Sequence, residues 1–467
     1  MTTPVVSACI AGALVGLGYS LSPMTAWFGV AMVALFIGTG RGLHGRERTW
    51  VLGLLAAALV SRLLALAVLF LTTWRVDGSI AVLIPDEAYL AQQAQLMRLV
   101  ALGDRLSVVE QLVVSDQYGD SSLNTVHAYL QLLLGEAPHG LRLLHVGLYL
   151  TACVMLHRVV RAAFGKVAAL GGLAVVLFMP SLFVWSIAFL KETPSQFLTV
   201  LGVTGTILMV QSRPVLVRLL AAGIAVTAVL AIASVRPGAE SVLGGGIVVG
   251  AIAAVLVRRP FLLAGAVVCC VVGGVLVAGR GPQVQQRAQA LLVEAATSHI
   301  GYINTVGRNY KVLDAEFYER RVEGTVRPID AARFTPAVTA RYLIRGMSTF
   351  FLVPLPQQAS SASIVAYLPE QLGWLLLAAL SVIGIVAGLR IDATVTIVLA
   401  SVILLGAAAI GISSGNIGTL IRHRGMVMVL LPWLASLGAC QLLTWVRLRA
   451  RRSRAAAAPL GRSHAAY

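Results

Sequence analysis

A proline followed by two acids forms the first group in this chain whose residue types suit chemistry. Asp86 and Glu87 come directly after Pro85, and Tyr89 follows two residues later. A carboxylate here is suited to act as a general base toward a hydroxyl group, or to ligate a divalent cation that bridges a phosphate. Asp86 is therefore the first candidate catalytic residue and metal ligand, with Glu87 beside it and Tyr89 in support. The alternative is a solvated helix start, where proline and acids are favoured.

A lysine–glutamate pair ends a long apolar segment and precedes Pro194. Lys191 is suited to bind a phosphate group, and Glu192 to orient that lysine or a metal ion. The alternative is a lysine that extends out of the apolar segment into water and is neutralised by the neighbouring acid.

Arginines form a third set of candidates, because guanidinium groups bind phosphate through paired hydrogen bonds. The set comprises Arg236, Arg345, Arg422 and Arg424, with His423 between the last two. Pairing with acids of the protein or with resident phospholipid is an equal alternative for the arginines. His423 has no second histidine three or four residues away, so we interpret it as a hydrogen-bonding spacer rather than a metal ligand.

Tyrosine, asparagine and arginine alternate in a fourth group, formed by Tyr302, Asn304, Arg308 and Tyr310. Such side chains stack on sugar rings and hydrogen-bond to them, which makes these residues candidates for acceptor or sugar contacts. An ordinary folded loop has the same composition about as often.

The elements that position these groups are predicted to be membrane helices. Of the 467 residues, 58% are hydrophobic and 12% are charged, against about 25% charged in soluble domains. Apolar runs of about 20 residues recur along the chain, and in lipid only helices pair every backbone group within one such segment. The predicted fold class is an all-α polytopic membrane protein.

About twelve spans are predicted. They cover residues 4–20, 22–40, 50–73, 141–157, 167–189, 195–212, 216–235, 240–257, 260–279, 371–389, 393–413 and 426–445. The short apolar piece 346–356 is predicted to be re-entrant or interfacial. Arg62 lies near the middle of one span, where a charge must find a partner. We expect a neighbouring span to provide that partner.

Basic loops orient the predicted spans. The net charge of +17 is explained by arginine-rich loops that stay in the cytoplasm, so nucleic acid is not an expected partner. Both termini are then cytoplasmic, and the candidate residues lie on the outer face. The predicted organisation is a helical hairpin with a basic loop (1–49), a membrane core (50–279) with a first outer loop (74–140), a second outer loop (280–345), a re-entrant segment with the last helices (346–445), and a basic tail (446–467).

The order of these motifs resembles the GT-C superfamily of membrane glycosyltransferases, and most closely the bacterial proteins similar to dolichyl-phosphate-mannose mannosyltransferases. The resemblance covers most of the chain from about residue 50. It rests on the Asp86–Tyr89 motif, on the Pro-Ser…Trp-Ser…Leu-Lys-Glu stretch at 180–192, and on Gly-Asn-Ile-Gly-Thr…Arg-His-Arg at 415–424. Many members carry a large soluble domain after the last span, whereas here a basic tail follows it.

The resemblance implies a transferase of the cell envelope in the inner membrane of a bacterium. A polyprenyl-phosphate sugar would be the donor, and a glycan, lipid or protein at the outer face the acceptor. Asp86 would be the base or metal-positioning carboxylate, with Mg²⁺ or Mn²⁺ as the expected cation. Lys191, Arg422 and Arg424 would be candidates for binding the donor phosphate.

Three other functions remain open from the residues alone. A polymerase or ligase of lipid-linked glycans would depend on an arginine or histidine rather than on Asp86. A flippase of lipid-linked oligosaccharides, or another transporter, would need a polar cavity that crosses the membrane. A non-catalytic membrane scaffold would have outer charges that pair among themselves.

Overall fold

The computed structural model describes residues 23–74, 85–115, 122–135, 138–258, 281–303, 310–318, 321–322, 325–326, 329–358 and 362–456. Within these ranges the regular structure is helical, apart from a small antiparallel hairpin of β1 (Arg321–Val322) and β2 (Thr325–Val326). The predicted helical polytopic class is confirmed. The predicted spans 4–20 and 260–279 lie outside the described residues.

Eight described helices are long and apolar enough to cross a membrane, or up to ten if each of two bent pairs forms one span. The eight are α2 (Pro23–Gly40), α3 (Gly45–Leu69), α8 (Pro138–Phe164), α11 (Glu192–Gln211), α12 (Val215–Val235), α13 (Ala239–Arg258), α17 (Ala362–Ile391) and α18 (Ala393–Ser413). Helix α3 continues into the short π-helix η1 (Phe70–Trp74). The count of twelve spans and a GT-C-like arrangement stay predictions.

The bent pairs differ from the straight spans expected at 167–189 and 426–445. Helix α9 (Lys166–Phe178) meets α10 (Pro180–Ile187) at 60°, and α19 (Ile417–Met428) meets α20 (Leu431–Ala456) at 68°. Pro180 explains the first break, because its ring excludes a continuous helix through that point. Arg422 lies within α19, before the bend to α20, so the residues around it are helical and not part of a connecting loop.

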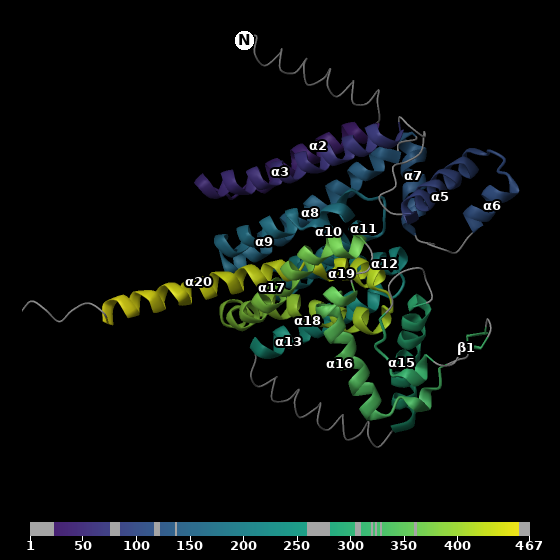
Figure 1. Ribbon diagram of the computed structural model, residues 1–467. Helices are drawn as coiled ribbons and strands as arrows, with labels where there is room; N and C mark the ends of the chain where they lie inside the picture. Colours follow the sequence, from purple (N-terminus) through teal and green to yellow (C-terminus); the bar gives the residue numbers. More distant parts are fainter. Residues whose placement is uncertain are drawn as a thin grey trace, which may run out of the picture.

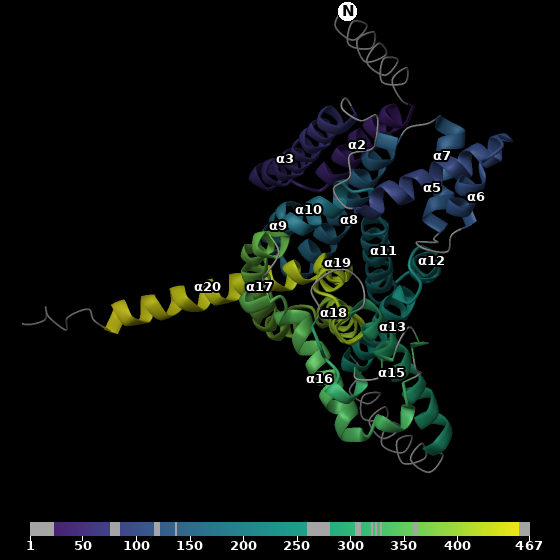
Figure 2. The same ribbon diagram turned by 45° about the vertical axis from the view of Figure 1, so that its right-hand side comes forward.

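Two groups of shorter elements flank the bundle at one end, as Figures 1 and 2 show. The first lobe comprises α5 (Pro85–Leu102), α6 (Val108–Ser115) and α7 (Ser122–Leu134). The second lobe comprises α15 (Gly281–Ile303), η2 (Ala315–Phe317), the hairpin, η3 (Ala331–Arg333), α16 (Pro336–Leu352) and η4 (Pro356–Gln358). Helix α16 includes most of the predicted 346–356 segment but begins at Pro336, so that segment is the end of a longer helix.

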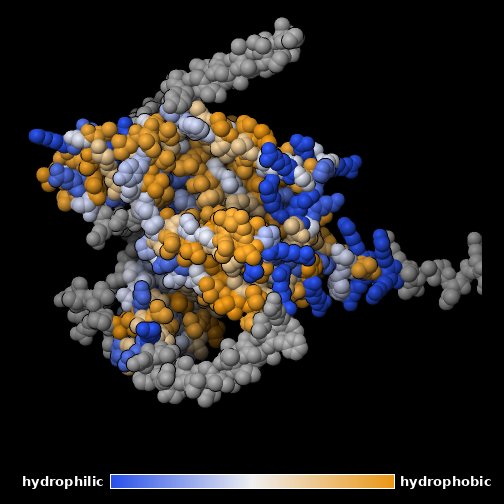
Figure 3. Space-filling view, turned by 180° about the vertical axis from the view of Figure 1, so that it is seen from behind, coloured by the Kyte–Doolittle hydropathy of each residue, from blue (hydrophilic) through white to orange (hydrophobic). Residues whose placement is uncertain are grey.

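The basic turns between spans contact one another at the other end of the bundle. Arg161 Nε donates to Glu47 Oε1 at 2.5 Å, which joins the last turn of α8 to the first turn of α3. Gln211 at the end of α11 donates to Asp392 between α17 and α18, at 2.9 Å. Viewed from behind in Figure 3, apolar residues cover much of the middle of the bundle, and hydrophilic residues gather near the exposed end of α20. This distribution is typical of a protein surrounded by lipid.

Candidate functional site

Four charged side chains from distant segments meet in one ion-pair network: Asp86, Glu192, Arg236 and Arg422. We call it the outer network, after the face on which the charge pattern of the loops predicts it to lie. Arg422 Nη1 donates to Asp86 Oδ2 at 2.5 Å, and Arg422 Nε donates to Glu192 Oε1. Arg236 Nη2 donates to the same Glu192 oxygen at 2.6 Å. These residues were singled out in the sequence one by one, and the fold brings them together.

Helix ends position the members of the outer network. Asp86 lies in the first turn of α5 and Glu192 in the first turn of α11, where carboxylates are favoured by the helix dipole. Arg236 follows the last residue of α12, and Arg422 lies in the short helix α19. Because α11 ends at the basic turn that holds Gln211, the outer network lies at the opposite end of the bundle, about 30 Å away.

Burial separates the two acids of the outer network. The Glu192 side chain is 1% exposed, whereas that of Asp86 is 34% exposed and that of Arg422 is 23% exposed. Glu192 therefore lies beneath the arginines, and Asp86 lies on the accessible side. Two polar atoms here, Glu192 Oε2 and Arg236 Nη1, are buried and have no hydrogen-bond partner in the structure. Unpaired buried donors and acceptors are costly and are common where a ligand or water binds.

The geometry holds two guanidinium groups close together. Both arginines donate to the same oxygen of Glu192, whose negative charge offsets the repulsion between them. Adjacent arginines of this kind are matched to a phosphate group, which accepts hydrogen bonds on several oxygens. The network can therefore bind an anion and also presents an accessible carboxylate in Asp86.

Several predicted residues lie beside the outer network. Lys191 directly precedes Glu192 and is half-buried, and Tyr89 lies one turn after Asp86 on α5. His423 Nδ1 is 3.5 Å from Ser414 Oγ, and its ring meets the edge of Tyr302, with centroids 5.9 Å apart. Tyr302 from the second lobe therefore lies near the network through His423.

Glu87, predicted as a catalytic companion of Asp86, occupies an interior position instead. It forms an ion pair with Arg142 at 2.8 Å, and both side chains are fully buried. The Phe189 amide also donates to Glu87 Oε1, at 2.6 Å. Glu87 joins the first lobe to α8 and to the α10–α11 turn, and it has no exposed oxygen with which to meet a substrate.

Two predicted phosphate-binding arginines are not part of the outer network. Arg424 is fully buried and donates to Gln371 Oε1 at 2.9 Å and to the Val353 carbonyl. Arg345, which lies on α16, forms an ion pair with Asp314 at 2.7 Å. Residues 422 and 424 are two apart, so a helix directs their side chains to different faces.

The predicted sugar contacts are placed only in part. The buried Tyr310 hydroxyl donates to the Ser414 carbonyl, and burial raises the pKa of this tyrosine. Tyr310 therefore fixes the second lobe against the end of α18. Asn304 and Arg308 lie outside the described residues.

Sequence reasoning did not single out Arg142, which holds Glu87. A usable signal was present, because an arginine at the start of a predicted span requires a partner, and Glu87 was an acid close to the same predicted face. Among the described residues, no group of three or more His, Cys, Asp or Glu side chains could hold a metal ion. The divalent cation stays a prediction.

Comparisons with known proteins leave the family open. No family model matches the chain, and no similar protein was found among curated sequences or solved structures. The resemblance to GT-C transferases therefore rests on the motifs alone, and the conclusion at this stage is a polytopic helical membrane protein with a charged network at one end.

Proposed function

We propose that the chain is a membrane glycosyltransferase that moves a sugar from a polyprenyl-phosphate donor to an acceptor at the outer face. The observation that supports this proposal is the contact of Arg422 with both Asp86 and Glu192. A candidate phosphate-binding residue, Arg422, is thereby in direct contact with the candidate base, Asp86. The network also lies at the end of α11 away from the basic turns, which the charge rule assigns to the cytoplasm.

In the proposed reaction the donor phosphate replaces Asp86 as the partner of Arg422. Asp86 then accepts the proton of an acceptor hydroxyl, whose oxygen forms a bond to the anomeric carbon of the sugar. The bond from that carbon to the phosphate oxygen breaks, and its electron pair stays on the phosphate. Arg236 and Arg422 stabilise the negative charge that develops there.

Lys191 and Glu192 have separate roles in this proposal. Glu192 is too deeply buried to meet the acceptor, and it holds the two arginines side by side. Lys191, next to it in the chain, is assigned to the donor phosphate as a further cation. A divalent cation, if the reaction uses one, would be bound by Asp86 together with the phosphate.

The test is sugar transfer from a synthetic polyprenyl-phosphate donor by the purified full-length protein. We expect Asp86→Asn to lower the transfer rate by a factor on the order of 10²–10⁴, the usual contribution of a general base. Asp104→Asn is the matched control, because Asp104 is exposed in the turn after α5. A folded Asp86→Asn protein with full transfer would refute the assigned base.

A non-catalytic scaffold is the second candidate, because the acids and arginines of the outer network pair with one another. A scaffold would use these ion pairs only to fix α5, α11 and α19. Substitution of Asp86 would then alter thermal stability, and no donor would yield product with the unaltered protein. A polymerase or ligase, which would depend on an arginine or histidine and not on Asp86, would keep its activity in Asp86→Asn.

A further inference from the structure

Helix α16 carries a second basic surface, separate from the outer network. The Nη1 atoms of Arg341 and Arg345 lie 3.1 and 2.7 Å from the carboxylate oxygens of Asp314. The two arginine side chains remain 53% and 46% exposed. One carboxylate cannot neutralise two guanidinium groups, and each guanidinium has five N–H donors. This surface therefore has excess positive charge and donors that face outward.

The packing of α16 on α18 fixes the depth of these arginines. The Tyr342 hydroxyl donates to the Ile412 carbonyl at 2.5 Å. A Cβ added to Gly346 would lie 2.4 Å from the Ile412 side chain, so the two helices touch closely here. Ile412 belongs to the last turn of α18, at the end of a membrane span. Arg341 and Arg345 are thus level with the span end, where lipid headgroups begin.

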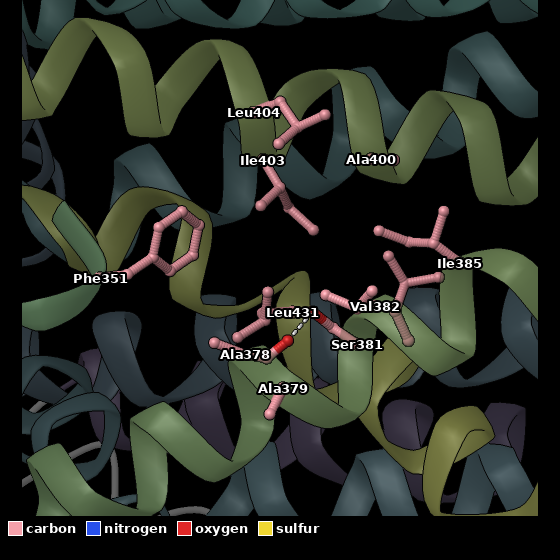
Figure 4. Close-up of a pocket in the computed structure, with 11 residues that line it drawn as sticks. Phe351, Ala378, Ala379, Ser381, Val382, Ile385, Ala400, Ile403, Leu404 and Leu431 are labelled. Atoms are coloured by element: carbon pink, nitrogen blue, oxygen red, sulfur yellow. Dashed lines mark hydrogen bonds between the residues drawn. The ribbon is translucent and has the colours of Figure 1, made fainter. Parts of the chain in front are cut away.

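An apolar cavity of about 310 Å³ lies between α16, α17, α18 and the start of α20, as Figure 4 shows. Its wall includes Phe351 of α16, Val382 of α17, and Ile403 and Leu404 of α18. Val382 and Leu404 are exposed, so the cavity opens on the surface that faces lipid. The polar lining residue Ser381 donates its hydroxyl to Ala378 O at 2.7 Å, within its own helix, and the cavity therefore suits a hydrocarbon chain.

The cavity and the arginines are spaced as the two parts of a phospholipid are. Phe351 follows Arg345 by six residues on α16, which separates them by about 9 Å along that helix. Because α16 runs across the long axis of the bundle in Figures 1 and 2, the difference in depth is given by α18. Ile403 precedes Ile412 by nine residues on α18, or about 13 Å. A phosphate at the arginines would therefore place the upper half of an acyl chain at the level of the cavity.

We propose that this surface is a binding site for an anionic phospholipid of the surrounding membrane. The phosphodiester binds Arg341 and Arg345, and one acyl chain enters the cavity between α16 and α18. Arginine is suited to this contact because its planar group binds two phosphate oxygens at once. The site does not depend on the proposed transferase activity, since neither arginine belongs to the outer network.

The experiment measures lipid retention by native mass spectrometry of the full-length protein in detergent. Phosphatidylglycerol and phosphatidylcholine with identical acyl chains are titrated in turn. We expect the unaltered protein to prefer phosphatidylglycerol, and Arg341→Gln/Arg345→Gln to bind it at least tenfold more weakly. Arg287→Gln/Arg390→Gln is the control, because it removes the same charge from exposed arginines elsewhere.

A second variant tests the acyl-chain part of the site. Ala400 lines the cavity, and Ala400→Phe should fill it and weaken retention even though both arginines remain. Equal retention by this variant would overturn the placement of the chain. Equal retention by Arg341→Gln/Arg345→Gln, or no preference for phosphatidylglycerol, would overturn the headgroup site. Tighter binding of polyprenyl phosphate at the same arginines would also overturn it, because the surface would then belong to the donor.

Discussion

At the residue scale, the adjacent acids Asp86 and Glu87 have opposite environments. Successive side chains on a helix point about 100° apart, so one faces the arginines of the outer network and the other faces the interior. Glu87 is fully buried with Arg142, whereas Asp86 is 34% exposed with Arg422. The two acids therefore have separate roles, one in fixing the first lobe and the other in the proposed chemistry.

Removing one partner of the buried pair should destabilise the protein strongly. Glu87→Ala or Arg142→Ala leaves a buried charge without its ion-pair partner, a change that costs about 3–5 kcal/mol. The double variant Glu87→Leu/Arg142→Met should lose less stability than either single variant, because it removes both buried charges. Thermal unfolding in detergent measures both effects. Single variants as stable as the unaltered protein would mean that the pair does not hold the lobe.

His299 should make the second lobe sensitive to acid. Burial lowers its pKa to about 4 from an ordinary value of 6.5, so the folded state keeps this histidine neutral where the unfolded state takes up a proton. Its contribution to stability is therefore complete above pH 6.5 and is lost as the pH falls toward 4. The loss at pH 5 should be about 2 kcal/mol.

His299→Gln provides the comparison, because glutamine also accepts a hydrogen bond from the Val312 amide but does not titrate. We expect the unfolding midpoint of this variant to fall less between pH 7 and pH 5. Parallel pH profiles for the two proteins would contradict the assignment.

At the element scale, breaks in helices were the features that hydropathy did not predict. The apolar run at 167–189 continues through Pro180 without a charged residue, so its average hydropathy gives no sign of a 60° bend. Arg62 explains how the break is tolerated, because it donates to Leu177 O at 3.0 Å and to Ser186 Oγ at 2.7 Å. The sequence indicated that this arginine needs a partner but not that the partner is a broken helix.

Close contact between α17 and α20 should depend on two glycines that face each other, Gly384 of α17 and Gly438 of α20. A Cβ added to Gly384 would lie 1.8 Å from the Leu434 carbonyl oxygen, which is backbone and cannot move aside. Gly384→Ala should therefore lower the unfolding midpoint and the yield of folded protein. Gly373→Ala is the control on the same helix, because nothing lies within 4 Å of its added Cβ.

The changes in stability caused by the two alanine substitutions should differ in sign as well as in size. Alanine favours a helix over glycine by about 1 kcal/mol, so Gly373→Ala should leave stability unchanged or raise it slightly. Equal stability of the two variants would show that α17 and α20 are not in contact at this point.

At the scale of the whole molecule, hydropathy predicted the helical membrane class, and residue type singled out each member of the outer network as a separate candidate. The recurring apolar runs were sufficient for the class, because in lipid a single segment of this length can pair all its backbone groups only as a helix. The pairing within the network could not be predicted, since Asp86 and Arg422 are distant in sequence and come together only through packing. For the same reason, Arg345 and Arg424 could not be separated from Arg422 by residue type.

The orientation of the molecule can be measured in intact cells. Single cysteines at Asp104 and Arg213, in a background lacking the five native cysteines, would lie at opposite ends of the bundle. We expect a membrane-impermeant maleimide to label Asp104→Cys and not Arg213→Cys, because basic turns stay in the cytoplasm. The reverse labelling would place the outer network inside the cell and contradict the proposed function.

The most direct measurement compares donor binding with turnover in two variants of the outer network. If the donor phosphate replaces Asp86 on Arg422, then Asp86→Asn should bind a polyprenyl-phosphate sugar as tightly as the unaltered protein, or more tightly, while kcat falls at least a hundredfold. Arg422→Gln should lose binding itself, by at least tenfold in Kd. Weaker donor binding in Asp86→Asn with kcat unchanged would contradict the account.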